Sequence, residues 1–151
     1  MNSMLAELDD YTVNPYAINA GFRLTNLQIL LVEDNEADAY LTQRALDGNA
    51  KVGDVVLAKD GIEALEMIDS GAVQPDLAIV DLRMPRKDGF AFLKDLSTRS
   101  SAQFLAIVLT SSTAGPDILR SWKLGAVEFV TKRDSIAAMA AALDHVISNI
   151  M

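Results

Sequence analysis

The sequence contains no cysteine, no basic residue among its first ten positions and no long apolar run. Without cysteine, the chain can form neither a disulfide framework nor a thiolate metal site. Without a basic start, residues 1–10 do not resemble a secretory signal. The longest apolar runs, such as Ile29–Val32 and Phe104–Leu109, are far shorter than the ~20 residues that span a bilayer. We therefore expect a soluble, cytoplasmic protein with no membrane partner.

Acidic residues outnumber basic residues by 21 to 13, which gives a formal net charge of −8 and an isoelectric point near 4.5. Such a surface repels phosphate backbones, so we expect no nucleic-acid partner. Half of the residues are apolar, which is enough for a packed core. A length of 151 residues suits one domain.

Residues 1–26 show no clear hydrophobic period, and Asn14-Pro15 is a signal that breaks regular structure. We interpret this segment as an N-terminal arm and residues 27–151 as the folded domain. Tyr16 and Phe22 are apolar enough to pack against another surface. Two interpretations stay open: a flexible terminus, or an arm that docks on its own domain or on a partner.

After the arm, short apolar segments alternate with helical patterns. The predicted strands are Gln28–Val32, Val55–Ala58, Leu77–Val80, Phe104–Leu109 and Val127–Val130. The predicted helices are Ala37–Leu46, Gly61–Ile68, Phe90–Leu96, Pro116–Leu124 and Ile136–Ile150. This alternation predicts an α/β fold with a five-stranded parallel sheet and helices on both faces. In such sheets, ligands bind beyond the carboxyl ends of the strands.

Acidic side chains follow two of the predicted strands. Glu33 and Asp34 follow the first strand, and Asp81 follows the third. Two carboxylates ~4 Å apart repel each other by ~4 kcal/mol at an effective dielectric of 20, which is costly unless a proton or a cation relieves the repulsion. Hard oxygen ligands favour Mg²⁺. The alternative is that Asp34 or Asn35 only caps the following helix, which explains one residue but not acids on two strand ends.

Asp81 is the candidate nucleophile of this edge. A carboxylate beside Mg²⁺ can attack phosphorus and form an aspartyl phosphate. The phosphoryl oxygens then need donors, and Lys132 after the fifth strand and Thr110 at the end of the fourth can supply them. Either residue alone has an ordinary structural explanation, so the joint placement of all three carries the interpretation.

Four segments in order then resemble a known family. They are Ile29–Asn35 (ILLVEDN), Val80–Gly89 (VDLRMPRKDG), Val108–Ser111 (VLTS) and Gly125–Lys132 (GAVEFVTK). From Gln28 to the C-terminus, the chain resembles the receiver domain of bacterial two-component response regulators. The resemblance implies a flavodoxin-like, doubly wound sheet with strand order 2-1-3-4-5.

The resemblance also implies a role for each matching residue. Asp81 resembles the phosphoacceptor, and it is also one of the Mg²⁺ ligands. The other implied ligands are Asp34 directly, Glu33 in the outer acidic position and the backbone carbonyl of Arg83. Thr110 and Phe129 resemble the switch pair, and Lys132 resembles the partner of the phosphoryl oxygen.

One position departs from the family pattern. The family usually has proline after the lysine, joined by a cis bond, whereas this chain has Arg133. A cis bond before a residue other than proline costs ~2.5–4 kcal/mol, so we expect a trans bond between Lys132 and Arg133. The loop that holds Lys132 can therefore differ from that of relatives.

The implied function is phosphoryl acceptance on Asp81 from a sensor histidine kinase. The stretch Glu33–Asp38 (EDNEAD) is similar to receivers paired with phytochrome-type kinases. No output domain follows the last predicted helix, so we expect signalling through contacts with a target or a phosphotransfer protein. We expect no free-standing catalysis beyond slow loss of the phosphoryl group. A homodimer through the fourth and fifth predicted helices is also expected, because the last helix is rich in apolar residues.

Three alternatives compete with this function. The first is a receiver-like binding module that is never phosphorylated, which the departure at Arg133 favours. The second is a Mg²⁺-dependent phosphatase, but that chemistry usually needs an acid two residues after the nucleophile, where Arg83 stands. The third is a flavodoxin, but no Ser/Thr/Gly-rich phosphate loop follows Val32.

Overall fold

A computed structural model describes residues 25–99, 103–111 and 114–151 of the chain. Five parallel strands form one sheet in the order β2-β1-β3-β4-β5. The strands are β1 (Leu27–Val32), β2 (Val52–Ala58), β3 (Leu77–Val80), β4 (Leu105–Thr110) and β5 (Glu128–Thr131). The helices are α2 (Glu36–Asp47), α3 (Gly61–Ser70), α4 (Gly89–Ser97), α5 (Gly115–Lys123) and α6 (Ile136–Ile150). The predicted fold class and strand order are confirmed; the arm predicted for residues 1–26 lies almost wholly outside the described residues.

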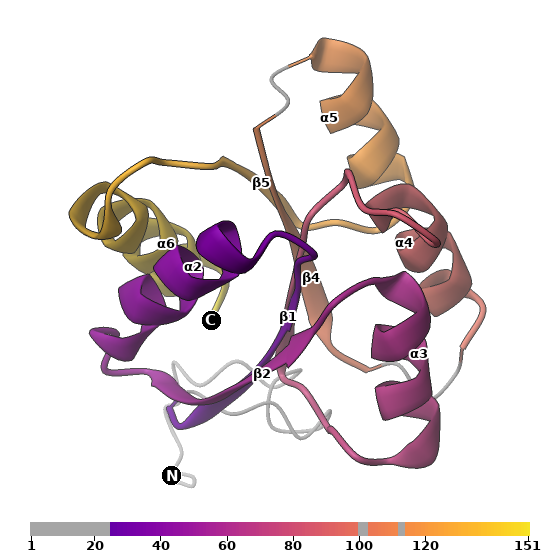
Figure 1. Cartoon of the computed structure of the whole chain (residues 1–151), viewed down its shortest axis with the longest axis horizontal. Helices are drawn as coiled ribbons and strands as arrows, with labels where there is room; N and C mark the ends of the chain where they lie inside the picture. Colours follow the sequence, from indigo (N-terminus) through magenta and orange to yellow (C-terminus); the bar gives the residue numbers. More distant parts are fainter. Residues whose placement is uncertain (1–24, 100–102, 112–113) are drawn as a thin grey trace, which may run out of the picture.

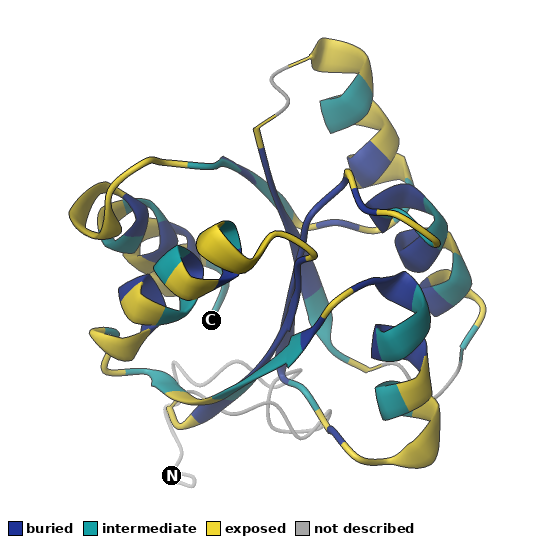
Figure 2. Ribbon diagram, in the orientation of Figure 1, coloured by how far each residue is buried: buried dark blue, intermediate teal, exposed yellow. Residues whose placement is uncertain are grey.

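The helices cover both faces of the sheet. Helices α2 and α6 lie on one face, and α3, α4 and α5 lie on the other (Figure 1). Each face has its own apolar cluster, because alternate strand residues point to opposite sides. Leu30 and Val80 pack under α3 and α4, whereas Ile29 and Ile79 pack under α2 and α6. The buried side of each helix faces the sheet (Figure 2). In the described part of the chain, no helix is long and apolar enough to cross a membrane.

The central strands are apolar throughout because both of their sides are covered. All four residues of β3 are completely buried, and its bounds are those that the sequence predicts. Strand β2 lies at the sheet edge and begins at Val52, three residues before the predicted start. Its exposed residues Gly53 and Asp54 interrupt the apolar pattern, which hides the beginning of the strand in the sequence.

Side chains at the strand ends also start the helices. The Asn35 side chain accepts a hydrogen bond of 2.9 Å from the backbone N–H of Asp38 and so caps α2. Asp88 caps α4 in the same way, through the N–H of Ala91. The cap of α2 is therefore Asn35 and not Asp34, which leaves the Asp34 carboxylate available at the end of β1.

The loop between β3 and α4 carries Asp81 and is tied to three helices. Its basic side chains each form an ion pair with an acid from a different helix or helix cap. The pairs are Arg83–Asp117 (2.6 Å) toward α5, Arg86–Asp60 (2.6 Å) toward the start of α3, and Lys87–Asp95 toward α4. In each of these pairs at least one side chain is partly exposed, and together the three pairs fix the path of the loop.

Gly89, the first residue of α4, permits a close approach to this loop. A Cβ atom at this position would lie 2.4 Å from the backbone oxygen of Asp81 and 2.8 Å from Cα of Leu82. Both atoms belong to the backbone and cannot move aside without distorting the strand end that carries Asp81. The lack of a side chain at Gly89 is therefore a packing requirement of the site.

We predict that Gly89→Ala destabilises the fold by about 1–3 kcal/mol, because the added methyl group overpacks the strand end. Gly115→Ala is the matched control, since Gly115 is also the first residue of its helix and has no atom within 4 Å of the added Cβ. Urea unfolding of both variants measures the difference. Equal stability of the two variants would contradict the close approach.

Candidate functional site

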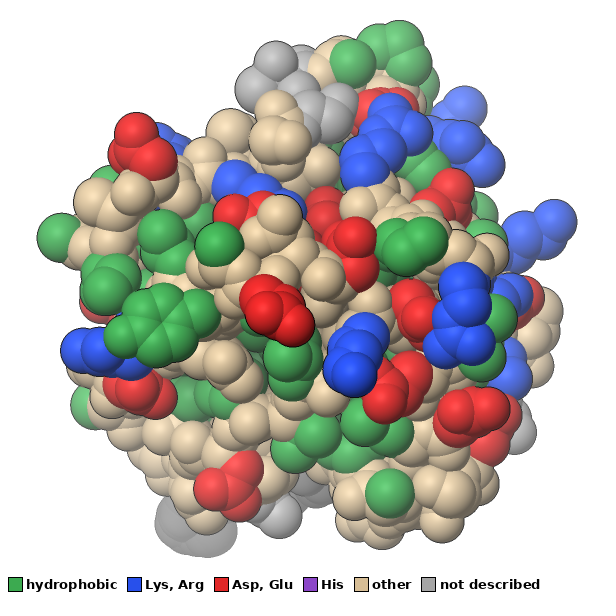
Figure 3. Space-filling model, viewed as in Figure 1, with side chains coloured by type: hydrophobic (Ala, Val, Ile, Leu, Met, Phe, Trp, Pro, Cys, Tyr) green, Lys and Arg blue, Asp and Glu red, His purple; other side chains and the backbone are tan. Residues whose placement is uncertain are grey.

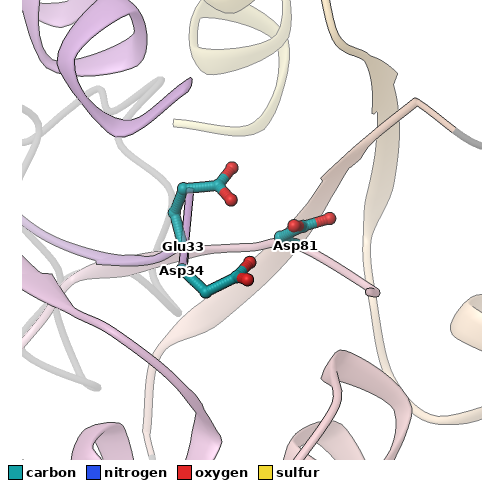
Figure 4. Close-up of side chains that lie close together, drawn as sticks. All are labelled: Glu33, Asp34 and Asp81. Atoms are coloured by element: carbon teal, nitrogen blue, oxygen red, sulfur yellow. The ribbon is translucent and has the colours of Figure 1, made fainter. Parts of the chain in front are cut away.

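Three carboxylates meet where β1 and β3 end. The strands are paired, with Val32 opposite Val80, so the residues that follow them emerge side by side. Glu33, Asp34 and Asp81 each place a carboxylate oxygen within 4.8 Å of the others. The side chains of Glu33 and Asp34 extend from one strand end toward the side on which Asp81 lies (Figure 4). The structure thus brings together all three acids that the sequence singled out.

The three acids differ in their exposure to water. Glu33 and Asp81 are only 2% and 5% exposed, whereas Asp34 is exposed. Burial raises the pKa of the Glu33 carboxyl to about 7; Lys132 opposes this shift and the charge of Asp81 adds to it. Glu33 therefore changes its charge near neutral pH, which an ordinary glutamate does not.

Lys132 lies at the end of β5 and reaches across to the acids. Its Nζ atom is 2.9 Å from Glu33 Oε1, 2.8 Å from Asp38 Oδ2 and 3.3 Å from Asp81 Oδ2. Burial alone would lower the pKa of Lys132, but the contacts with Asp38 and Glu33 outweigh it and raise the pKa. The lysine is therefore a fixed positive charge of the site. Acidic and basic side chains lie beside one another near the middle of the face shown in Figure 3.

Asp38 is the site residue that sequence reasoning missed. It lies in the first turn of α2 and is 94 positions away from Lys132 in the chain. Its only sequence signal is its place in the acidic stretch Glu33–Asp38, where an acid in the first turn of a helix has an ordinary explanation. Only the packing of α2 beside the end of β5 shows that Asp38 contacts the lysine.

Thr110 and Phe129 lie on the same side of the sheet. Thr110 is fully buried at the end of β4, and its backbone oxygen accepts a hydrogen bond of 2.9 Å from the N–H of Lys132. Phe129 pairs in register with Val108, two residues before Thr110, and its partly buried ring packs against the cluster under α3 and α4. The predicted switch pair thus shares one face, because strand residues two apart point the same way.

Arg83 lies in the turn directly after Asp81. Its backbone N–H is 3.3 Å from Asp81 Oδ1, and its guanidinium group pairs with Asp117 of α5. This places its backbone beside the acids and directs its side chain away from them. The described residues contain no cis peptide bond, so the Lys132–Arg133 bond is trans, as the sequence predicts.

The residues of this site fit a small divalent cation. Oε1 of Glu33 is buried, and the contact that the structure gives it is the ion pair of 2.9 Å with Lys132. Two further carboxylates lie within reach of it, and all of the candidate ligand atoms are oxygen. An all-oxygen, acidic set with an open side toward water matches the preference of Mg²⁺.

Comparison with known sequences identifies a protein family that agrees with this site. The family described as response regulator receiver domain matches residues 29–144. The response regulator Rcp1 of Synechocystis is 29% identical over 110 residues, which cover 69% of this chain and 75% of that protein. Protein-glutamate methylesterase/protein-glutamine glutaminase 6 of Anaeromyxobacter dehalogenans is 33% identical over 110 residues. Those residues cover 73% of this chain but only 30% of the enzyme's length.

Solved structures agree with this comparison. The phosphorylated cyanobacterial phytochrome response regulator RcpA has a TM-score of 0.73 at 30% identity, over 81% of this chain and 91% of that one. The Mn²⁺-bound form of response regulator Rcp1 has a TM-score of 0.72 at 26% identity, over 81% and 92%. With the family matched over most of its length, this chain belongs to the receiver domains of two-component response regulators.

Proposed function

We propose that this chain is a signalling switch that a sensor histidine kinase phosphorylates on Asp81 with the help of Mg²⁺. The observation that carries the proposal is the surroundings of Asp81. Its carboxylate is buried, lies 3.3 Å from the ammonium group of Lys132 and shares a 4.8 Å cluster with Glu33 and Asp34. The receiver acts as an acceptor in this scheme and not as a free-standing catalyst.

The transfer forms one bond and breaks one. An oxygen of Asp81 attacks phosphorus and forms the acyl phosphate, while the phosphorus–nitrogen bond of the donor phosphohistidine breaks. Lys132 donates hydrogen bonds to the transferred group, and the Thr110 hydroxyl is the further donor that we assign to it. Glu33, Asp34, Asp81 and the Arg83 carbonyl would hold Mg²⁺, which when bound would neutralise charge on the phosphoryl group.

The switch that we propose runs along one face of the sheet. A phosphoryl group adds about −1.5 to −2 charges, and its oxygens draw the Thr110 side chain toward Asp81. Phe129, on the same face, then turns into the space that Thr110 leaves. This motion changes the surface formed by α5, β5 and α6, where a target or a phosphotransfer protein binds.

A phytochrome-type kinase is the partner class that the relatives support. RcpA is a cyanobacterial phytochrome response regulator, and this chain is 30% identical to it over most of both lengths. From the sequence pattern we further propose a cytoplasmic receiver at residues 27–151 that follows an N-terminal arm at 1–26. The second candidate function is an unphosphorylated binding module, which Arg133 in place of the family's proline favours.

The acceptor role predicts that Asp81→Asn abolishes phosphorylation, because the amide cannot form an acyl phosphate. Incubation with acetyl phosphate and Mg²⁺, followed by intact-mass measurement, should show one added phosphoryl group on the wild-type protein and none on the variant. Asp47→Asn, at the exposed end of α2, is the control and should match the wild type. Equal labelling of D81N would remove Asp81 as the acceptor, and an unlabelled wild type would favour the binding module.

The raised pKa of Glu33 predicts a pH-dependent affinity for Mg²⁺. Below pH 7 the Glu33 carboxyl holds a proton, which the cation must displace, so affinity should fall by up to tenfold for each pH unit lost. Calorimetric titration at pH 8, 7 and 6 measures the slope. Glu33→Gln should flatten the profile over this range, whereas Glu36→Gln, on the exposed surface of α2, should leave it unchanged. A flat wild-type profile would refute the role of Glu33.

A homodimer through α5 and α6 is the oligomer that we propose. Among the described residues, four of the five exposed large apolar side chains lie on or beside these helices and β5. They are Leu119, Trp122, Val127 and Ile136. Exposed apolar surface is typical of protein interfaces, and we propose that these side chains contribute to one.

The dimer predicts that Trp122→Glu shifts the protein to monomer, because a charge in an apolar interface is costly. Sedimentation equilibrium at tens of micromolar, with and without beryllofluoride, measures the change. Tyr40→Glu is the matched control, since Tyr40 is similarly exposed, at 57%, but lies on α2 and not on α5, β5 or α6. A monomeric wild type under both conditions would end the proposal.

A further inference from the structure

The Lys132 ammonium group has as many acidic neighbours as it has N–H donors. A lysine carries three donors, and three carboxylates lie within 3.3 Å of Nζ. An incoming phosphoryl oxygen therefore meets an ammonium group that carboxylates already share. Asp81 ceases to be a free carboxylate when it is phosphorylated, so Glu33 and Asp38 are the acids that compete with the phosphoryl oxygen for Lys132.

The three carboxylates differ in how readily they can release the lysine. The side chain of Glu33 is 1% exposed and that of Asp81 is 6% exposed, whereas that of Asp38 is 42% exposed. A buried carboxylate that loses its partner is left without solvation, which is strongly unfavourable. Asp38 can instead return to water, so it is the contact that breaks at least cost.

Asp38 is also held firmly on its own helix. Its backbone N–H donates to the Asn35 side chain, and the next residue, Ala39, is buried in the core. Lys132, by contrast, is followed by the exposed residues Arg133 and Asp134. Asp38 on α2 thus provides a fixed acceptor 2.8 Å from Nζ of Lys132. The lysine itself lies at the start of an exposed loop.

Asp38 does not belong to the metal cluster. The three acids with oxygens within 4.8 Å of one another are Glu33, Asp34 and Asp81, and Asp38 is outside this group among the described residues. Its contact is with the lysine alone. A change at Asp38 can therefore act on Lys132 while the candidate metal ligands stay in place.

We propose that Asp38 is a positioning residue that holds Lys132 before phosphorylation and competes with the phosphoryl oxygen for its ammonium group. The proposal rests on the proposed function and adds a regulator to the same site. Asp38 favours the unphosphorylated state, and its removal should stabilise the phosphorylated one. A surface ion pair contributes up to ~1 kcal/mol, and this pair is partly exposed at Asp38, so we expect an effect of up to about fivefold.

The test measures the affinity of the full chain for beryllofluoride, a phosphoryl mimic, by calorimetry with saturating Mg²⁺. Asp38→Asn should bind about two- to fivefold more tightly than the wild type. Asp38→Glu, which keeps an acceptor for Lys132, should restore the wild-type affinity. Glu36→Gln is the matched control, because it removes one charge from the same helix turn without a contact to Lys132, and should leave the affinity unchanged.

The outcomes separate the proposed competition by Asp38 from the proposed phosphorylation of Asp81. Tighter binding by D38N, with rescue by D38E and no effect of E36Q, supports the competition. Binding by D38N that equals that of E36Q, or is weaker than that of the wild type, overturns it and leaves the phosphorylation proposal standing. A wild type that binds Mg²⁺ but not beryllofluoride overturns both. Lys132→Ala in the D38N background supplies a further check, since the gain should vanish when no ammonium group is present.

Discussion

The arrangement of this site depends on a balance of charges. The sheet brings several carboxylates together, and one lysine among them offsets their repulsion. Two adjacent parallel strands end in acids, and such carboxylates repel one another by several kcal/mol when nothing lies between them. Lys132 neutralises part of this charge through contacts of 2.8–3.3 Å. The proton held by Glu33 near neutral pH offsets a further part. The site is thus prepared for a cation and for an anionic group that uses the lysine.

The rest of the fold keeps this charge cluster in place. Three ion pairs hold the loop after β3, and the absence of a side chain at Gly89 lets α4 start against the backbone of Asp81. The backbone oxygen of Thr110 accepts a hydrogen bond from the N–H of Lys132, which holds Thr110 at the same edge of the sheet. Direct contacts therefore connect Asp81 to the ends of β4 and β5.

The sequence predicts the elements whose pattern is set by burial. Strand β3 and helix α6 have the predicted bounds, because a fully buried strand and a long helix with a serine cap are unambiguous. The last strand is shifted by one residue, to Glu128–Thr131, since Val127 is apolar but 43% exposed and precedes the pairing with β4. The positions of the acids and of Lys132 could also be predicted, because each of these residues follows an apolar strand. The ends of parallel strands lie at one edge of the sheet.

The contact between Asp38 and Lys132 could not be predicted in the same way. It depends on how α2 lies relative to the end of β5, and no local pattern encodes that distance.

Peptide mapping after phosphorylation and borohydride reduction tests the central claim most directly, because reduction converts an aspartyl phosphate to homoserine. The account predicts homoserine at position 81 alone; homoserine at position 34 or 38, with position 81 unchanged, would contradict it.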